Sequence, residues 1–322
     1  MLNRRQALSI AASAALPLHA FAQEAWPSKP IRMINTGAAG GTNDVMCRAI
    51  AEPLSKMLGQ PVIIESKPGA GGVVGTQYLL QQPADGYTIV TNHSGFVIAP
   101  LLNPSANYDP LKDYVPVSLK ALAPLVLLAH PSMPATLQEF VAYARANPGK
   151  LEWGTSALGG VGHLGCELFH DMAGIKGMVK VAFNGTAPST QALVGGQIKY
   201  LLSAFTSATA GLIADGRLRF LGVSTPTRSA LFPTIPAIAE VVPGFQAEVW
   251  YGFMARSGTP EPVLQKLGDA IAQVVSQPDM AEKFKGVGVV AKGGRAELTE
   301  ILRREHALWS RVIKEKNIKL DA

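Results

Sequence analysis

Short apolar runs alternate with helical patterns along most of the chain. The run at residues 31–35 predicts a strand. After a glycine-rich turn, apolar positions at helical spacing extend from 44 to 58, where Gly59 ends them. The same analysis predicts strands at 62–65, 88–92, 124–129, 151–155, 179–183, 199–202, 220–223 and 249–254. It predicts helices at 74–82, 137–147, 163–172, 188–194, 208–214, 262–276 and 297–316. Such alternation favours an α/β fold with mostly parallel sheets flanked by helices.

Two glycine-rich segments follow strands in the same way. "MINTGAAGGTND" (33–44) and "EWGTSALGGVGH" (152–163) each run from a strand through a loop into the start of a helix. A helix N-terminus presents free N–H groups and the positive end of the helix dipole. Ligands of open α/β sheets bind at the carboxyl ends of strands. We therefore expect two domains that hold an anion between these loops, in a cleft.

The first residues have the features of an export signal. "MLNRR" is basic, residues 7–21 are mainly apolar, and Ala20-Phe21-Ala22 fits an A-x-A cleavage site. We expect a signal peptide at 1–22 and a periplasmic chain of 322 − 22 = 300 residues. No later apolar run is long enough to span a membrane. A content of 48% hydrophobic and 16% charged residues is typical of a compact globular protein.

The net charge of +6 restricts the partners only slightly. Lys and Arg are scattered, without basic runs interleaved with aromatic residues, so we expect no nucleic-acid partner. A mildly positive field suits an anionic small ligand, and it suits plain solubility equally well. Cys47 and Cys166 fall in different predicted helices. We interpret them as two small buried thiols, although a disulfide between them stays open.

Gly160, Gly162 and Gly165 form a literal G-x-G-x-x-G between a strand and a helix. A dinucleotide site also requires an acidic residue at the end of the next strand, where this chain has Asn184. The first glycine-rich loop lacks the Gly-Lys-Ser/Thr of a nucleotide phosphate loop. We therefore expect no cofactor.

Two further chemistries are weighed against simple binding. Ser94 or Ser156 could serve a secreted hydrolase of carboxylate esters, but no G-x-S-x-G is present, and adjacent His93 and Ser94 on a strand point to opposite faces. His163, Glu167 and His170 share one face of a predicted helix, which fits a metal site or a solvated polar face. We expect no catalytic residue and no metal site, and we interpret the chain as a binding protein.

Longer motifs carry a family resemblance. They include "GAAGGTNDVMCRAIAEPLSKMLGQPVIIESKPGAGG" (37–72), "PADGYTIV" (83–90), "ANPGKLEWGTSALGGVGHLGCELF" (146–169) and "ADGRLRFLGVSTPTRSALFPTIPAIAE" (214–240). These motifs closely resemble the substrate-binding proteins of tripartite tricarboxylate transporters, the TctC or Bug family. The resemblance extends over essentially the whole chain after the signal peptide.

The resemblance implies a two-domain clamshell of the type II periplasmic-binding class, with the ligand in the cleft. Domain 1 would comprise residues 23–122 and 248–322, and domain 2 residues 123–247. Members of this family bind small organic carboxylates and deliver them to membrane permease subunits. We expect a monomeric receptor without enzymatic activity. A receptor that reports ligand to a membrane sensor kinase would need the same site and stays open.

The resemblance places the ligand-binding residues in four segments. These are Gly37, Ala39, Gly40, Gly41, Thr42 and Asn43 in the first loop; His93, Ser94 and Gly95 after a strand; Ser156, Gly159, Gly160, Val161, Gly162 and His163 in the second loop; and Phe183, Asn184 and Gly185 in a turn, with Ser203 at the end of the next strand. Asp44 is interpreted as a helix cap.

Three departures from the family pattern bear on the ligand. Relatives commonly have an aromatic residue near Gly37, a Lys at the position of Asn184 and an Asp near Ser203. Loss of the ring leaves room, and loss of Lys and Asp removes charge. We therefore expect a dicarboxylate with a bulky, even aromatic, spacer, for which Phe183 would offer a flat surface.

Overall fold

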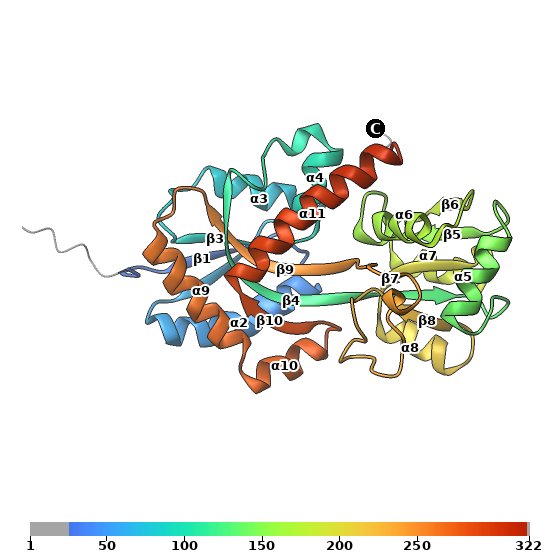
Figure 1. The fold of residues 1–322 in the computed structure, drawn as a ribbon. Helices are drawn as coiled ribbons and strands as arrows, with labels where there is room; N and C mark the ends of the chain where they lie inside the picture. The colour runs from blue at the N-terminus through green and yellow to red at the C-terminus, as the bar shows by residue number, and fades with distance from the viewer. Residues whose placement is uncertain (1–25, 321–322) are drawn as a thin grey trace, which may run out of the picture.

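The computed structural model describes residues 26–320 (Figure 1). Their strands form one ten-stranded sheet in the order β2-β1-β3-β9-β4-β7-β5-β6, with β10 and β8 also paired to β4. The strands are β1 Ile31–Asn35, β2 Val62–Ser66, β3 Thr88–His93, β4 Tyr114–Ala129, β5 Glu152–Thr155, β6 Val179–Ala182, β7 Tyr200–Ala204, β8 Arg219–Val223, β9 Glu248–Arg256 and β10 Val290–Gly294. The predicted signal peptide lies outside the described residues.

One long strand, β4, runs through two parts of the sheet. Its residues 114–124 pair with β9, and its residues 125–129 pair with β7 and β8. We call β1, β2, β3, β9, β10 and the helices on them the first lobe, and β5 to β8 with their helices the second lobe. The predicted strand at 124–129 is only the end of β4. Register shifts at 116–118 and 119–121 break the alternation of its earlier part, which hid that part from the sequence pattern.

The predicted α/β fold is confirmed, with a sheet that is mixed. The pairs β1–β2, β1–β3, β5–β6 and β5–β7 are parallel. The pairs of β4 with β7, β8, β9 and β10 are antiparallel, and so is β3–β9. Strand β4 leaves the first lobe, and β9 returns to it beside β4, so these two strands must run in opposite directions.

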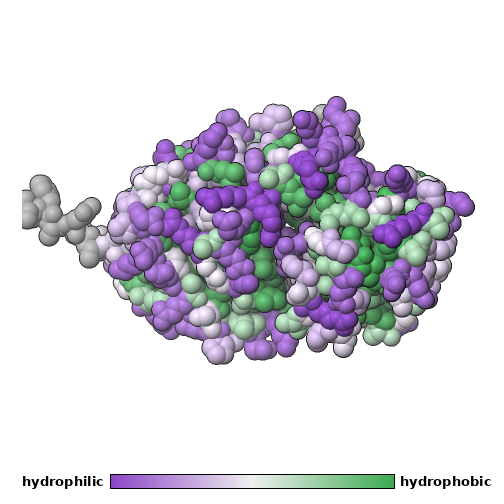
Figure 2. Space-filling model, in the orientation of Figure 1, coloured by the Kyte–Doolittle hydropathy of each residue, from purple (hydrophilic) through white to green (hydrophobic). Residues whose placement is uncertain are grey.

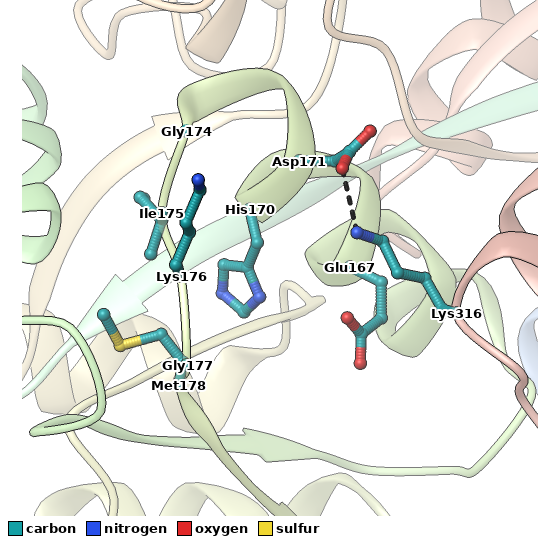
Figure 3. A pocket seen from close by; sticks show the side chains of 9 residues that line it. All are labelled: Glu167, His170, Asp171, Gly174, Ile175, Lys176, Gly177, Met178 and Lys316. Carbon is teal, nitrogen blue, oxygen red and sulfur yellow. Dashed lines mark hydrogen bonds and ion pairs between the residues drawn. The ribbon is translucent and has the colours of Figure 1, made fainter.

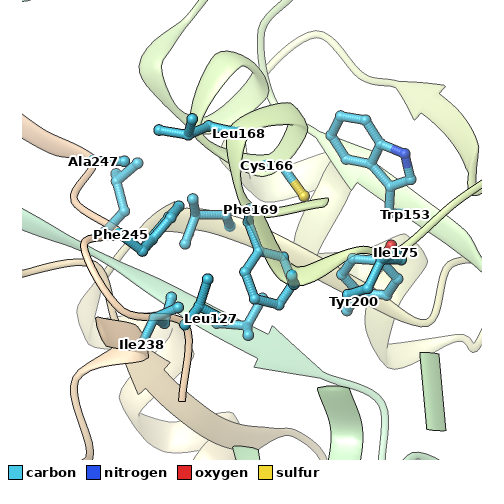
Figure 4. Packing of buried hydrophobic residues seen from close by; sticks show 14 of the residues in the cluster. Leu127, Trp153, Cys166, Leu168, Phe169, Ile175, Tyr200, Ile238, Phe245 and Ala247 are labelled. Atoms are coloured by element: carbon cyan, nitrogen blue, oxygen red, sulfur yellow. The ribbon is translucent and has the colours of Figure 1, made fainter. Parts of the chain in front are cut away.

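Helices cover both faces of each lobe. On the first lobe, one face carries α2 (Thr42–Leu58), α9 (Glu261–Val275) and α10 (Pro278–Lys285), and the other carries α3 (Val73–Leu80), α4 (Gly95–Leu102) and α11 (Arg295–Glu315). On the second lobe, α5 (Leu137–Ala146) and α6 (Val161–Ala173) lie opposite α7 (Thr186–Val194) and α8 (Ser207–Ala214). Figure 4 shows the α6 side of the second core, where Phe169 and Cys166 pack over Leu127 and Tyr200.

The last helix connects the lobes. Leu298, near the start of α11, packs with Trp250 in the first-lobe core. Trp309 and Val312, near its end, belong to the core of the second lobe. Figure 1 shows α11 running from the first lobe toward α6, where Lys316 pairs with Asp171 at 2.8 Å. The relative position of the lobes therefore depends on this helix as well as on β4 and β9.

The sequence pattern missed α4, α10 and β10. Helix α4 is apolar on nearly all sides, including the buried Phe96, Val97 and Ile98, so it shows no helical alternation.

Both thiols are free and buried, as predicted, and they lie in separate cores, Cys47 in the first lobe and Cys166 in the second. Among residues 26–320, no helix is long and apolar enough to cross a membrane. The face in Figure 2 is mostly hydrophilic, with smaller apolar areas on both lobes.

Candidate functional site

Two helices begin at glycines that follow strands of different lobes. Gly41 is the N-cap of α2 and Gly160 the N-cap of α6, and both have extended backbone angles. Glycine offers no side chain to accept hydrogen bonds from the first turn. Within residues 26–320, the N–H groups of residues 42–44 and 161–163 have no hydrogen-bond partner. Helices α5 and α8, in contrast, start with capping boxes at Thr136 and Thr206. Free donors and a helix dipole make each glycine-capped start a suitable anion site.

The glycine pattern of α6 serves close packing of the helix on the sheet. A Cβ atom at Gly162 would lie 2.6 Å from the backbone oxygen of Leu202 in β7. A Cβ atom at Gly165 would lie 2.8 Å from the Cβ atom of Ala247. The literal G-x-G-x-x-G therefore has a structural explanation without a dinucleotide. It fixes the start of α6 against the end of β7.

A cavity of about 200 Å³ is lined from both lobes. Eight of the predicted site residues line it: His93, Gly95, Ser156, Gly160, Val161, Gly162, His163 and Ser203. The sequence analysis did not name the other lining residues, Ile98, Leu125, Ala157, Thr186, Ala204 and Val249. Ile98 lies on α4, which the sequence pattern missed. The hydroxyl of Ser203 is buried and has no partner within the described chain. The cavity thus combines free helix N–H groups, an available hydroxyl and an apolar wall.

The remaining predicted residues lie outside this lining. Ser94 is fully buried, and its Oγ accepts a hydrogen bond from the N–H of Trp250 at 3.1 Å. Gly159 faces Leu102 of α4. The others are the first loop (Gly37, Ala39, Gly40, Gly41, Thr42 and Asn43) and the turn of Phe183, Asn184 and Gly185.

Two of the predicted reasons for a roomy ligand site need correction. A Cβ atom at Gly37 would lie 3.0 Å from the Cβ atom of Asn43 in α2, so the space directly beside Gly37 is already closely packed. Phe183 packs against the core between the second-lobe sheet and helices α7 and α8. Its ring is therefore part of the core and does not line the cavity.

A polar network supports the first loop from below. Asn35 Oδ1 accepts from the N–H of Gly37 at 2.9 Å and from Asn43 Nδ2 at 2.9 Å. Asn43 Oδ1 accepts from Lys120 Nζ at 2.6 Å. Lys120 is fully buried and is the one charged residue within the long strand β4. The sequence analysis missed it, although a lysine within an apolar strand is itself a signal.

Asp44 also has a role that differs from the prediction. Its carboxylate accepts from the N–H of Gly40 at 3.0 Å and pairs with Arg48 at 2.9 Å. Asp44 is the third residue of α2, and Gly41 occupies the cap position. The carboxylate therefore ties the loop to the helix and does not cap the helix. Hydrogen bonds from Gly40 and Arg48 hold the pKa of Asp44 below its usual value, although burial acts in the opposite direction.

Both histidines of the cavity are neutral near neutral pH. Burial, reinforced by the charge of Lys120, lowers the pKa of His93 to about 4. Burial, reinforced by Lys180, lowers the pKa of His163 to about 4. His93 Nδ1 accepts from the N–H of Gly95 at 3.1 Å, and His163 Nδ1 accepts from the N–H of Gly159 at 3.0 Å. These rings shape the loops and contribute no positive charge to an anion site.

His163 and His170, which share one face of α6 with Glu167, do not lie on a solvated surface. His163 and His170 are buried, and His170 Nε2 lies 2.7 Å from the hydroxyl of Tyr200. No three His, Cys, Asp or Glu side chains between residues 26 and 320 are grouped to hold a metal ion. The interpretation of a solvated polar face was wrong, because this face of α6 turns toward the sheet.

A second cavity of about 300 Å³ lies at the opposite end of α6 (Figure 3). Glu167, His170 and Lys176 line it, and the ion pair between Asp171 and Lys316 closes one side. It belongs to the contact between α6 and the end of α11. It is separate from the cavity at the N-terminus of α6.

The sequence profile of one family, described as the tripartite tricarboxylate transporter family receptor TctC, matches residues 46–318. This chain belongs to that family. The TctC chain is 32% identical to a protein from Pseudomonas sp., over 98% of this chain and 95% of the relative. It is 33% identical to the protein BugT of Bordetella pertussis, over 92% of each. Members of the TctC family are periplasmic solute-binding proteins and not enzymes, which confirms the expected class.

Solved structures agree with the observed fold. A TctC solute-binding protein from Polaromonas has a TM-score of 0.81 at 25% identity and covers 90% of this chain and 99% of its own. A Rhodopseudomonas palustris protein with adipate has a TM-score of 0.72 at 30% identity, with coverage of 91% and 99%. MatC from the same species, with bound malate, has a TM-score of 0.68 at 29% identity, with coverage of 89% and 100%.

Proposed function

We propose that this TctC protein captures a small dicarboxylate in the periplasm and delivers it to the membrane permease of a tripartite tricarboxylate transporter. The observation that supports the proposal is the cavity lined from both lobes, with the free N-terminus of α6 and the unpartnered Ser203 hydroxyl. A carboxylate accepts hydrogen bonds from both kinds of donor. Two relatives of known structure hold adipate and malate, and each of these molecules has two carboxylates, which agrees with the proposed ligand class.

The two carboxylates of the ligand would bind to helix starts of different lobes. One carboxylate would bind at Gly162 and His163 in the first turn of α6, beside Ser203. The other would bind at the free N–H groups of the first turn of α2. Ile98, Leu125 and Val249 form the apolar wall next to the first position. We therefore propose a dicarboxylate with an apolar spacer, and an aromatic spacer belongs to the same class.

Ser203→Ala is expected to raise the Kd of the bound dicarboxylate about tenfold while stability stays unchanged, because the buried hydroxyl has no other partner. A thermal-shift panel of adipate, malate, an aromatic dicarboxylate and their monocarboxylate counterparts would first identify the ligand. Calorimetry would then compare wild type with Ser203→Ala and with Ser207→Ala, an exposed control on α8. Absence of binding by the whole panel would contradict the proposed function.

The lobes are proposed to be the two domains, residues 23–122 with 248–322 and residues 123–247. The ligand would favour a closed arrangement because it contacts both. Saturating ligand is therefore expected to reduce the radius of gyration in small-angle X-ray scattering. An unchanged radius, with binding verified by calorimetry, would argue against closure.

A further inference from the structure

A buried lysine lies beneath the first glycine-rich loop. Lys120 occupies the bulge where Leu119 opposes Gly252 and Ala121 opposes Tyr251, so its side chain enters the face covered by α2. Its Nζ atom lies 2.6 Å from Thr91 Oγ1, 2.6 Å from Asn43 Oδ1 and 3.6 Å from the sulfur of Cys47. None of the ion pairs formed within residues 26–320 includes it.

This arrangement destabilises the folded state. An ammonium group removed from water and given only neutral partners loses much of its hydration energy, and an apolar side chain of similar length would suit the same space better. Burial accordingly lowers the pKa of Lys120. An anion bound near Lys120 would supply the negative charge that its protein partners lack.

The nearest anion site is the first turn of α2. Asn43, whose Oδ1 atom accepts from Lys120, is the second residue of that helix, and its own N–H and that of Thr42 are free. A carboxylate held by the N–H of Asn43 would be linked to the ammonium through the side chain of the same residue. Asp44 is not available as the partner, because its two oxygens already accept from Asn35, Gly40 and Arg48.

We propose that Lys120 is the counter-charge of the carboxylate site at the start of α2 and restricts this site to anionic groups. The inference rests on the proposed function, since it concerns one of the two carboxylates of the ligand. Lys120 acts through Asn43 and through its charge, without contacting the ligand. It is therefore a specificity-determining residue that supports the loop and the helix start from behind.

This role couples binding to protonation. A bound carboxylate favours the charged lysine, so binding should take up protons at a pH where part of the free protein has neutral Lys120. The titratable groups that face Lys120 are Cys47 of α2, His93 of β3 and Tyr251 of β9. His93 has a pKa of about 4, and burial raises the pKa of Tyr251 to about 12.

The test compares adipate binding by wild type, Lys120→Met and Lys56→Met, using calorimetry at several values between about pH 7 and pH 10. Lys56 is an exposed lysine in the last turn of α2 and controls for loss of one charge. Lys120→Met should raise the Kd about tenfold or more, reduce the preference for adipate over its monoamide, and abolish proton uptake. Wild type and Lys56→Met should bind more weakly as the pH rises. Cys47→Ala should retain the wild-type pH profile.

Each outcome decides between the two proposals. A wild type that binds adipate, combined with a Lys120→Met variant of equal Kd and equal pH profile, would overturn the counter-charge and leave the receptor function intact. A wild type that binds no carboxylate of the panel would overturn both. Thermal melting verifies that Lys120→Met is folded. Lys120→Gln is a second neutral variant for the same comparison if the methionine disturbs packing.

Discussion

Between about pH 6.5 and pH 8, Glu305 alone is expected to lower the free energy of unfolding by about 2 kcal/mol. The side chain lies buried on α11, where Oε2 accepts from Trp250 Nε1 at 2.8 Å. Burial raises the pKa of Glu305 to about 8, and the hydrogen bond from Trp250 offsets only part of this effect. In the unfolded chain the carboxyl group ionises near its ordinary value of 4.5. The unfolded state therefore binds fewer protons in this window, and stability falls as the pH rises.

Glu305→Gln should remove this loss, because glutamine keeps an acceptor for Trp250 and cannot ionise. Chemical denaturation of both proteins across the window measures the difference. His93, His163 and His170 have lowered pKa values and change stability in the opposite direction below about pH 6.5, but they are common to both proteins. Glu300→Gln removes an exposed carboxylate from the same helix and should retain the wild-type slope. An identical slope in Glu305→Gln would contradict the assignment.

Gly162→Ala is expected to impair both binding and stability. The added Cβ atom would lie 2.6 Å from the backbone oxygen of Leu202, which cannot rotate away, so the start of α6 must move off β7. Overpacking of this kind costs about 1–3 kcal/mol. The displaced turn carries the free N–H groups beside Ser203, so the Kd for the dicarboxylate should rise at least about tenfold.

Gly211→Ala is the matched control for this substitution. Gly211 also lies in a helix, but no atom lies within 4 Å of the position of its Cβ atom. Alanine in such a helical position should leave stability equal or slightly higher. Urea denaturation and calorimetry of both variants give the comparison. A Gly162→Ala protein with normal stability and normal affinity would show that α6 tolerates displacement from β7.

The strand-loop-helix segments were predictable because their signals are local. Glycines at the turn, apolar runs before it and helical spacing after it all lie within about fifteen residues, and secondary structure responds to such short patterns. The start of α6 and its placement after β5 followed from residues 152–163 alone. Strand β4 was recognised only at its end, since its bulges depend on its partners β9 and β10.

Side-chain roles required the tertiary structure. Ser94 looked like a loop hydroxyl next to a histidine. In the structure it is buried, and its Oγ atom accepts a hydrogen bond from the backbone N–H of Trp250, 156 residues away in the chain. His163 and His170 lie on a face that could have been exposed, and the position of the sheet made it internal. Gly37 suggested space for a ligand, but Asn43 in the following helix packs closely beside it.

The sequence by itself determined the α/β class, the two glycine-capped helix starts and the family of solute receptors, because each depends on residues close together in the chain. Only the tertiary structure decided that Lys120 lies under the first loop, that Ser203 faces a cavity and that α11 joins both lobes. These contacts join residues far apart in the chain; Lys120 and Asn43, for example, are 77 positions apart. Burial and charge environment arise from such long-range packing, which no local pattern encodes.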